Sequence, residues 1–386
     1  MSNNIAFSFS NCGLTDTQVV QLIGKLDHSS NMGNWRQKIR ELHLSGNSLT
    51  HTGINQFFGS IIPSCHLTHL DLSHNPLGVE GLQVLEDAIN EMMLESIQNL
   101  ILQNCLTCDP DINGALLTTF LEAVFTHYRQ LNCLDLSSNN LGLPGAQSLQ
   151  QASMLSQLHL SLFLNNTALG DEGLRAFAQG NWNLYKLGLQ GNSIHAKGIL
   201  SLAEGFSSGR CVVGNLLLDD NPLCLEGSRA VGEMLCGGKN GKLCTISMAR
   251  CKLTNTDSNC PQRRYVALQL FQALQNENII ELYVDENDFA GESIYVLAGF
   301  LHLCPKIQYF YSTHCGISSV DIKRLVRCLP SLQLGWSEIK FWKLGHNRIN
   351  DFAMYDIAII SHRMAVSLNH NLISDAMATK IWQVSL

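Results

Sequence analysis

The stretch LDLSSNNLGLPGAQSL, residues 134–149, contains the pattern that decides the fold. Leu134 and Leu136 alternate with polar residues ahead of Asn139, and Gly145 stands six residues after that asparagine. Alternation with a period of two predicts a short strand with one buried face. In several copies of the pattern an apolar helical spacing follows the glycine, so each unit is predicted to run from strand through loop to helix.

Thirteen copies of the pattern run through the chain. Each one reads apolar-x-apolar-x-x-marker-x-apolar, where the marker is asparagine, cysteine or threonine. The markers, 24 to 36 residues apart, are Cys12, Asn47, Asn75, Cys105, Asn139, Thr167, Asn192, Asn221, Cys251, Asn287, Cys315, Asn347 and Asn371. The copy at Cys105 is degenerate, because Thr107 falls where an apolar residue is expected. Such repetition indicates a solenoid whose units stack in parallel.

The marker residue is expected to turn inward where each strand ends. There the backbone loses its ladder partners, and an asparagine amide supplies both donors and an acceptor. We therefore predict an internal ladder of hydrogen-bonded asparagines, in which cysteine is a weaker substitute. The role of the markers in this interpretation is structural.

The repeat and the helix that follows it resemble the leucine-rich repeats of the ribonuclease-inhibitor-like class. The resemblance extends over one domain, residues 1–386, and implies an α/β solenoid of about 13 repeats. In that fold, a curved horseshoe, parallel strands line the concave face and helices the convex face. The resemblance implies a non-catalytic scaffold that binds a partner protein. One branch of the class acts as GTPase-activating proteins, which is the alternative function.

Composition excludes several classes of function. The formal net charge is -7 and no cluster of lysines and arginines stands out, which disfavours nucleic acid as a partner. Neither a signal peptide nor an apolar run of membrane-spanning length is visible, so a cytoplasmic monomer without cofactors is expected. A repeat protein without accessory domains also suits a bacterial effector that acts on host proteins in the host cytosol.

Sequence motifs for chemistry are weak. Residues 237–242 resemble a phosphate-binding loop, but Cys236 and Leu243 stand where glycine and serine or threonine are required. Cys105 and Cys108 form a lone CxxC pair. The 14 cysteines are scattered, which favours reduced thiols, and no catalytic motif supports an enzyme.

The candidate binding site is an acidic and aromatic patch on the exposed strand positions of repeats eight to twelve. Aromatic residues flanked by carboxylates are typical of protein-binding hot spots, and this patch is predicted to bind a basic segment of a partner. The convex helices and inserted loops remain the alternative binding surface. The predicted partner-binding residues are Asp219, Asp220, Arg250, Glu281, Tyr283, Asp285, Glu286, Tyr309, Tyr311, His314, Phe341, Lys343 and His346.

Three consecutive repeats place histidine directly before the marker, at His314, His346 and His370. Because parallel strands lie about 4.8 Å apart, these imidazoles are expected to form a file. The file suggests a shared divalent metal, a pH-sensitive contact or a chance alignment, and the sequence leaves these alternatives open.

Irregular spacing marks three insertions, at residues 28–38, before Asp109, and at residues 255–264. They are predicted to be surface loops, and residues 374–386 are predicted to form a closing helix.

Overall fold

The computed structural model describes residues 5–28, 35–60, 65–91, 93–106, 110–237, 242–255, 262–273, 275–276, 278–328, 339–361 and 365–377. They fall into two compact units, Met1–Asn192 and Ser193–Leu386, with the boundary directly after the marker Asn192.

The N-terminal unit alternates strands and helices. Its strands pair in parallel with their neighbours in chain order; they are β1 (Ile5–Ser8), β2 (Ile39–His43), β3 (His69–Asp71), β4 (Asn99–Ile101), β5 (Cys133–Asp135), β6 (Ser161–Phe163) and β7 (Trp182–Gly188). Its helices are α1 (Asp16–His28), α2 (Trp35–Lys38), α3 (His51–Ser60), α4 (Gly78–Asn90), α5 (Pro110–His127), α6 (Gly142–Ser153) and α7 (Gly170–Ala178).

The C-terminal unit continues the same alternation. Its parallel strands are β8 (Cys211–Leu217), β9 (Thr245–Ser247), β10 (Glu281–Tyr283), β11 (Tyr309–Tyr311), β12 (Phe341–Lys343) and β13 (Ala365–Ser367). Its helices are α8 (Ala196–Ser208), α9 (Cys224–Cys236), α10 (Gln262–Gln272), α11 (Ile294–Leu303), α12 (Ser319–Cys328) and α13 (Met354–Ser361), with 3-10 turns η2 (Gly291–Ser293) and η5 (Asp351–Ala353).

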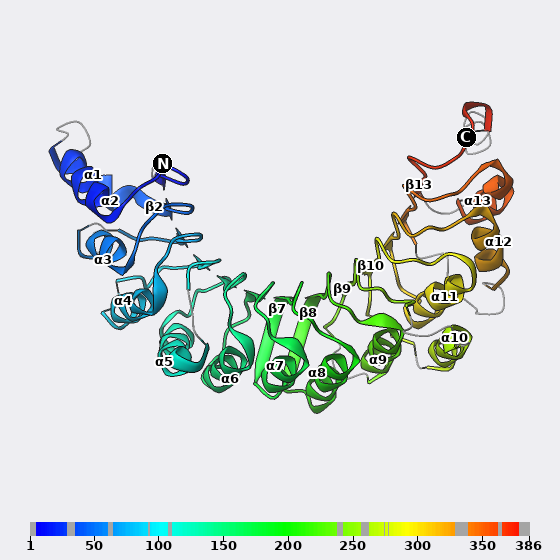
Figure 1. Cartoon of the computed structure of the whole chain (residues 1–386), viewed down its shortest axis with the longest axis horizontal. Helices are drawn as coiled ribbons and strands as arrows, with labels where there is room; N and C mark the ends of the chain where they lie inside the picture. The colour runs from blue at the N-terminus through cyan, green and yellow to red at the C-terminus, as the bar shows by residue number, and fades with distance from the viewer. Residues whose placement is uncertain are drawn as a thin grey trace. The chain divides into compact units, whose positions relative to one another are not determined.

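Within each unit, the helices cover one face of the sheet and leave the other uncovered, which we call the strand face (Figure 1). The central apolar residue of each short strand points to the helices and is buried, as at Leu134, Leu282 and Phe310, each 0% exposed. The flanking residues point to the strand face, because side chains alternate along a strand. The predicted repeat of parallel strand and helix is confirmed.

The marker residues form the predicted hydrogen-bonded ladder. In Asn139, Nδ2 donates to the carbonyls of Leu102 and Leu136, both at 2.8 Å. Its Oδ1 accepts from the backbone N–H groups of Cys105 (3.0 Å) and Leu106 (2.8 Å). One asparagine thus satisfies four backbone groups in two successive repeats, which is why the position demands an amide.

Cysteine takes over only part of this ladder. The Sγ of Cys251 lies 3.2 Å from the carbonyl oxygen of Leu218 in the preceding repeat. It has no second polar atom to accept from the backbone, and sulfur is a weak donor. The ladder therefore continues through the cysteine markers with fewer and weaker bonds.

The glycine six residues after the marker lets each helix approach the preceding loop closely. A Cβ atom on Gly145 would lie 2.5 Å from the Cβ of Leu141, and one on Gly227 would lie equally close, 2.5 Å, to Leu223. Such distances are far below van der Waals contact. The recurrence of glycine in the sequence is thus explained by packing rather than by backbone conformation.

Some local predictions were wrong. The insertion at residues 28–38 is not wholly a loop, because Trp35–Lys38 forms the helical turn α2, and Gln262–Gln272 of α10 includes the end of the insertion at 255–264. In the degenerate copy, the expected apolar position is filled one residue early by Leu106, which is buried. Thr107, Cys108, residues 238–241 of the glycine-rich motif and most of the predicted closing helix lie outside the described residues.

Candidate functional site

The candidate site lies on the strand face of the C-terminal unit. The strands there pair in register, so that Tyr283 on β10 stands beside Tyr311 on β11, which in turn stands beside Lys343 on β12. In the other exposed column, Glu281 stands beside Tyr309, and Tyr309 beside Phe341. Positions that are about 30 residues apart in the sequence therefore become neighbours, as the repeat predicts.

The residue directly before each marker has a left-handed backbone conformation. In the C-terminal unit these residues, called here the left-handed row, all have φ between 54° and 58°; they are Asp220, Arg250, Glu286, His314, His346 and His370. Histidine and aspartate tolerate this region comparatively well, whereas arginine and glutamate do so rarely. All six residues are exposed. Their conformation follows from the sharp turn into the marker, which leaves their side chains free to interact with one another.

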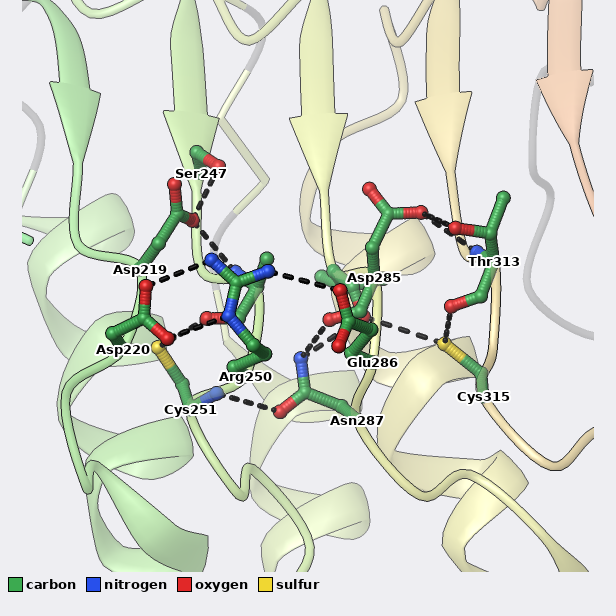
Figure 2. Close-up of polar contacts among 12 residues, drawn as sticks. Asp219, Asp220, Ser247, Arg250, Cys251, Asp285, Glu286, Asn287, Thr313 and Cys315 are labelled. Atoms are coloured by element: carbon green, nitrogen blue, oxygen red, sulfur yellow. Dashed lines mark hydrogen bonds and ion pairs between the residues drawn. The ribbon is translucent and has the colours of Figure 1, made fainter.

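Arg250 joins three members of the left-handed row. Its Nε and Nη2 donate to the two carboxylate oxygens of Asp220 at 2.5 and 2.7 Å, and its Nη1 donates to Glu286 Oε1 at 2.9 Å (Figure 2). The hydrogen bonds from Arg250 hold the pKa of Asp220 below its usual value, and the bonds that Arg250 donates to Asp220 and Glu286 raise the pKa of Arg250. The pair with Asp220 is a bidentate arginine–carboxylate contact, whose geometry is well defined.

Asp219 and Asp285 have a structural role in this arrangement. Asp219 Oδ1 accepts from Ser247 Oγ (2.5 Å) and from the N–H of Ala249 (2.7 Å), and its side chain is only 8% exposed. Asp285 Oδ1 accepts from the N–H and the hydroxyl of Thr313 at 2.7 and 2.6 Å. Both carboxylates tie one repeat to the next (Figure 2). We therefore leave Asp219 out of the contact surface proposed below.

The aromatic residues form a continuous shelf on β10 to β12. The rings of Tyr283 and Tyr311 stack with centroids 4.2 Å apart and planes 8° apart, and the Phe341 ring lies 6.1 Å from Tyr311. The hydroxyl of Tyr283 donates to Glu281 Oε2 at 3.2 Å. Partial burial and the neighbouring Glu281 carboxylate raise the pKa of Tyr283. The shelf is therefore uncharged, half-buried and edged by a carboxylate; Tyr309 extends it as a half-buried residue beside Phe341.

The three predicted histidines do form a file. His314 and His346 stack with ring centroids 4.1 Å apart and planes 12° apart, and His346 and His370 stack at 4.1 Å and 18°. Ring lone pairs lie in the ring plane, so those of nearly parallel, stacked rings do not converge on one metal ion. Within the described ranges, no group of three or more histidine, cysteine, aspartate or glutamate residues is arranged to hold a metal ion.

Sequence reasoning missed two kinds of residue. Ser247 and Thr313 hold Asp219 and Asp285. A signal was present, since each of these four polar residues lies at the end of a strand or in the turn that follows one. The N-terminal unit also has a polar cluster on its strand face: His43 lies 3.4 Å from Glu41, and its ring centroid lies 4.7 Å from that of His69. Burial lowers the pKa of His69, and the charge of His43 lowers it further.

The buried cysteines are poor nucleophiles. Cys211, Cys251 and Cys315 are buried thiols without a disulfide. Burial raises the pKa of each of these three thiols to about 12. Because the thiolate is the reactive form, these side chains are unsuited to catalysis at neutral pH.

Comparisons with known proteins agree with the repeat geometry. Models of the family described as Leucine Rich Repeat match residues 38–60, 64–85 and 129–149. The chain is 26% identical over 315 residues to NACHT, LRR and PYD domains-containing protein 5 of Mus musculus, which covers 74% of this chain and 25% of that protein. It is 27% identical over 241 residues to the ribonuclease inhibitor of Mus musculus, covering 56% of this chain and 51% of the inhibitor.

Among solved structures, the leucine-rich repeat-containing protein LegL7 of Legionella pneumophila superposes with a TM-score of 0.47 at 14% identity, covering 78% of this chain and 94% of that one. The chain spans about a quarter of the length of the mouse NACHT-containing relative and about half of the inhibitor.

The repeats and their asparagine ladder form a leucine-rich-repeat solenoid, and the sequence matches make the chain similar to proteins of the ribonuclease-inhibitor-like class. Solenoids of this kind present extended surfaces that typically bind other proteins. Of the helices in the described ranges, none combines the length and the apolar character that a bilayer span requires.

Proposed function

We propose that the strand face of the C-terminal unit binds a basic segment of a partner protein. The observation that carries the proposal is the stacked pair Tyr283 and Tyr311 with the Glu281 carboxylate at its edge. A stacked aromatic surface offers large contact area at low entropic cost, and its ring faces attract cations. A carboxylate at the edge of that surface adds a charged acceptor for an arginine or lysine.

The charges of the surrounding residues agree with a basic ligand. In the repeats of β8 to β10, the charged residues of the patch include the exposed Asp220 and Glu286 and the half-buried Glu281, and Arg250 lies between Asp220 and Glu286. Arg250 is already held by two of these carboxylates. The remaining negative charge would steer a basic segment toward the aromatic shelf.

The experiment that tests this proposal is fluorescence anisotropy with a labelled peptide of four arginines, four prolines and four glutamines. A peptide in which glutamine replaces the arginines is the charge control. The variant Tyr283→Ala/Tyr311→Ala removes the shelf, and Tyr185→Ala, which removes a 57% exposed tyrosine from the N-terminal unit, is the matched control. We expect the double variant to bind the arginine peptide at least about tenfold more weakly, as for hot-spot residues.

Unchanged binding by the double variant would move the site to the helices or the inserted loops. A parallel pull-down from a eukaryotic lysate with the same baits would recover the natural partner.

The alternative of a GTPase-activating protein requires an arginine that reaches into the nucleotide site of a GTPase. Arg250, the arginine among the predicted partner-binding residues, is engaged with Asp220 and Glu286. Releasing it would require breaking three charge-assisted hydrogen bonds. This geometry favours the binding function over the alternative.

A further inference from the structure

The charges on the strand face of the C-terminal unit are separated along the repeats. The exposed strand positions and left-handed row of β8 to β10 contain carboxylates and a single arginine. The corresponding positions of β11 to β13 contain no carboxylate; their ionisable groups are the tyrosines of β11, Lys343 and the three stacked histidines. Two adjoining regions of opposite character therefore lie on one in-register sheet.

The histidine file is suited to binding anions because its rings are exposed and close together. All three rings are open to solvent, and each lies 4.1 Å from the next. Uptake of protons would place up to three positive charges beside Lys343. Such a column repels itself unless an anion lies against it, so that anion binding and protonation favour one another.

The charged groups around the file do not neutralise it. Glu286 precedes His314 in the left-handed row, but its carboxylate accepts from Arg250. Asp288 faces the backbone of Gly316 and accepts from the N–H of Ala290. Partial desolvation lowers the pKa of His346, and the charges of His314, His370 and Lys343 lower it further. The Asp285 carboxylate accepts from the N–H and the hydroxyl of Thr313, directly before His314. Arg348, two residues after His346, is exposed and positive.

We propose that the histidine file and Lys343 bind an acidic stretch of the same partner segment whose basic stretch contacts the shelf of Tyr283 and Tyr311. This inference rests on the proposed function and specifies the partner: a segment with opposite charges at its two ends. Two strand steps, about 10 Å, separate β10 from β12. Contact with the file strengthens as the pH falls from 8 to 6.

The test compares two peptides by fluorescence anisotropy at pH 8.0 and 6.0. The first has four arginines, four prolines and four glutamates; the second has glutamines in place of the glutamates. A four-proline spacer is about 12 Å long in its extended form, which matches the separation of the two regions. Attraction between the ends of the first peptide is the same at both pH values, so the change with pH isolates the histidines.

We expect the glutamate peptide to gain at least about threefold in affinity relative to the glutamine peptide between pH 8.0 and pH 6.0. The triple variant His314→Asn/His346→Asn/His370→Asn removes the titrating groups, and asparagine tolerates the left-handed conformation. This variant should lose the gain and still bind the glutamine peptide, which also shows that it is folded.

An affinity ratio of the two peptides that is the same at pH 8.0 and pH 6.0 would overturn the histidine contact and leave the proposed function intact. A gain that persists in the triple variant would also overturn it, because the titrating group would lie elsewhere. Failure of both peptides to bind at either pH would overturn the proposed function, and the inference with it.

Discussion

Arg250 and Asp220 form a bidentate ion pair between two successive repeats, with N–O distances of 2.5 and 2.7 Å. Both residues lie in the left-handed row, where the turn into the marker residue directs their side chains along the edge of the sheet. The pair occupies a carboxylate that a basic partner would otherwise contact. Arg250 therefore occupies the place that an arginine of the partner would take beside Asp220.

Arg250→Ala should increase the affinity for the arginine peptide. The substitution changes the summed charge of Asp220, Arg250 and Glu286 from -1 to -2, since these residues carry -1, +1 and -1. A charge at contact distance in water is worth about 1 kcal/mol, so we expect about fivefold tighter binding at low salt. Arg264→Ala, which breaks the exposed pair between Arg264 of α10 and Glu292 of η2, is the control. Weaker binding by Arg250→Ala would show instead that this arginine contacts the partner.

Asn139→Ala should destabilise the chain strongly, because this asparagine satisfies four backbone groups. Leaving buried polar groups without partners costs about 1–3 kcal/mol each, and relaxation recovers part of that, so a loss of about 2–4 kcal/mol is expected. Asn139→Cys should lose less, since cysteine occupies the same position at Cys251 and Cys315. Urea unfolding followed by circular dichroism compares the midpoints; equal midpoints for the two variants would contradict the ladder account.

The sequence predicted the features that recur at the same position in successive repeats. The asparagine ladder and the histidine file follow from the spacing of the markers, because in-register parallel strands turn a period in the sequence into a column in space. The same register places Tyr283 beside Tyr311. The period of the repeat therefore predicts the position of each side chain on the sheet.

Hydrogen bonds between particular side chains could not be read from the period. Asp219 was expected on an exposed column, but it is buried, and its carboxylate accepts from Ser247 Oγ and the N–H of Ala249. The helical turn Trp35–Lys38 was missed for a related reason, since short segments outside the repeat have no copy to compare.

Gly145→Ala should destabilise the chain although alanine favours helices. The added Cβ would lie 2.5 Å from the Cβ of Leu141, which forces α6 away from its loop at a cost of about 1–3 kcal/mol. Gly24→Ala is the matched control, because nothing lies within 4 Å of a Cβ at that position in α1. The control should be more stable than the wild type by about 0.5–1 kcal/mol, from helix propensity. Thermal unfolding measures both, and shifts of the same sign would contradict the packing account.

His346 should titrate below the ordinary histidine pKa of 6.5, owing to partial desolvation and its neighbours His314, His370 and Lys343. His346 is a base whose pKa is lowered in the folded chain. The unfolded chain therefore takes up this proton first, and the stability contributed by neutral His346 is lost as the pH falls below 6.5. NMR titration of the imidazole C–H resonances measures the pKa directly. In the variant His314→Asn/His370→Asn the pKa of His346 should move upward, because two of the charges that oppose protonation are gone. A pKa of His346 that stays the same in this variant would show that the stacked neighbours do not influence its protonation.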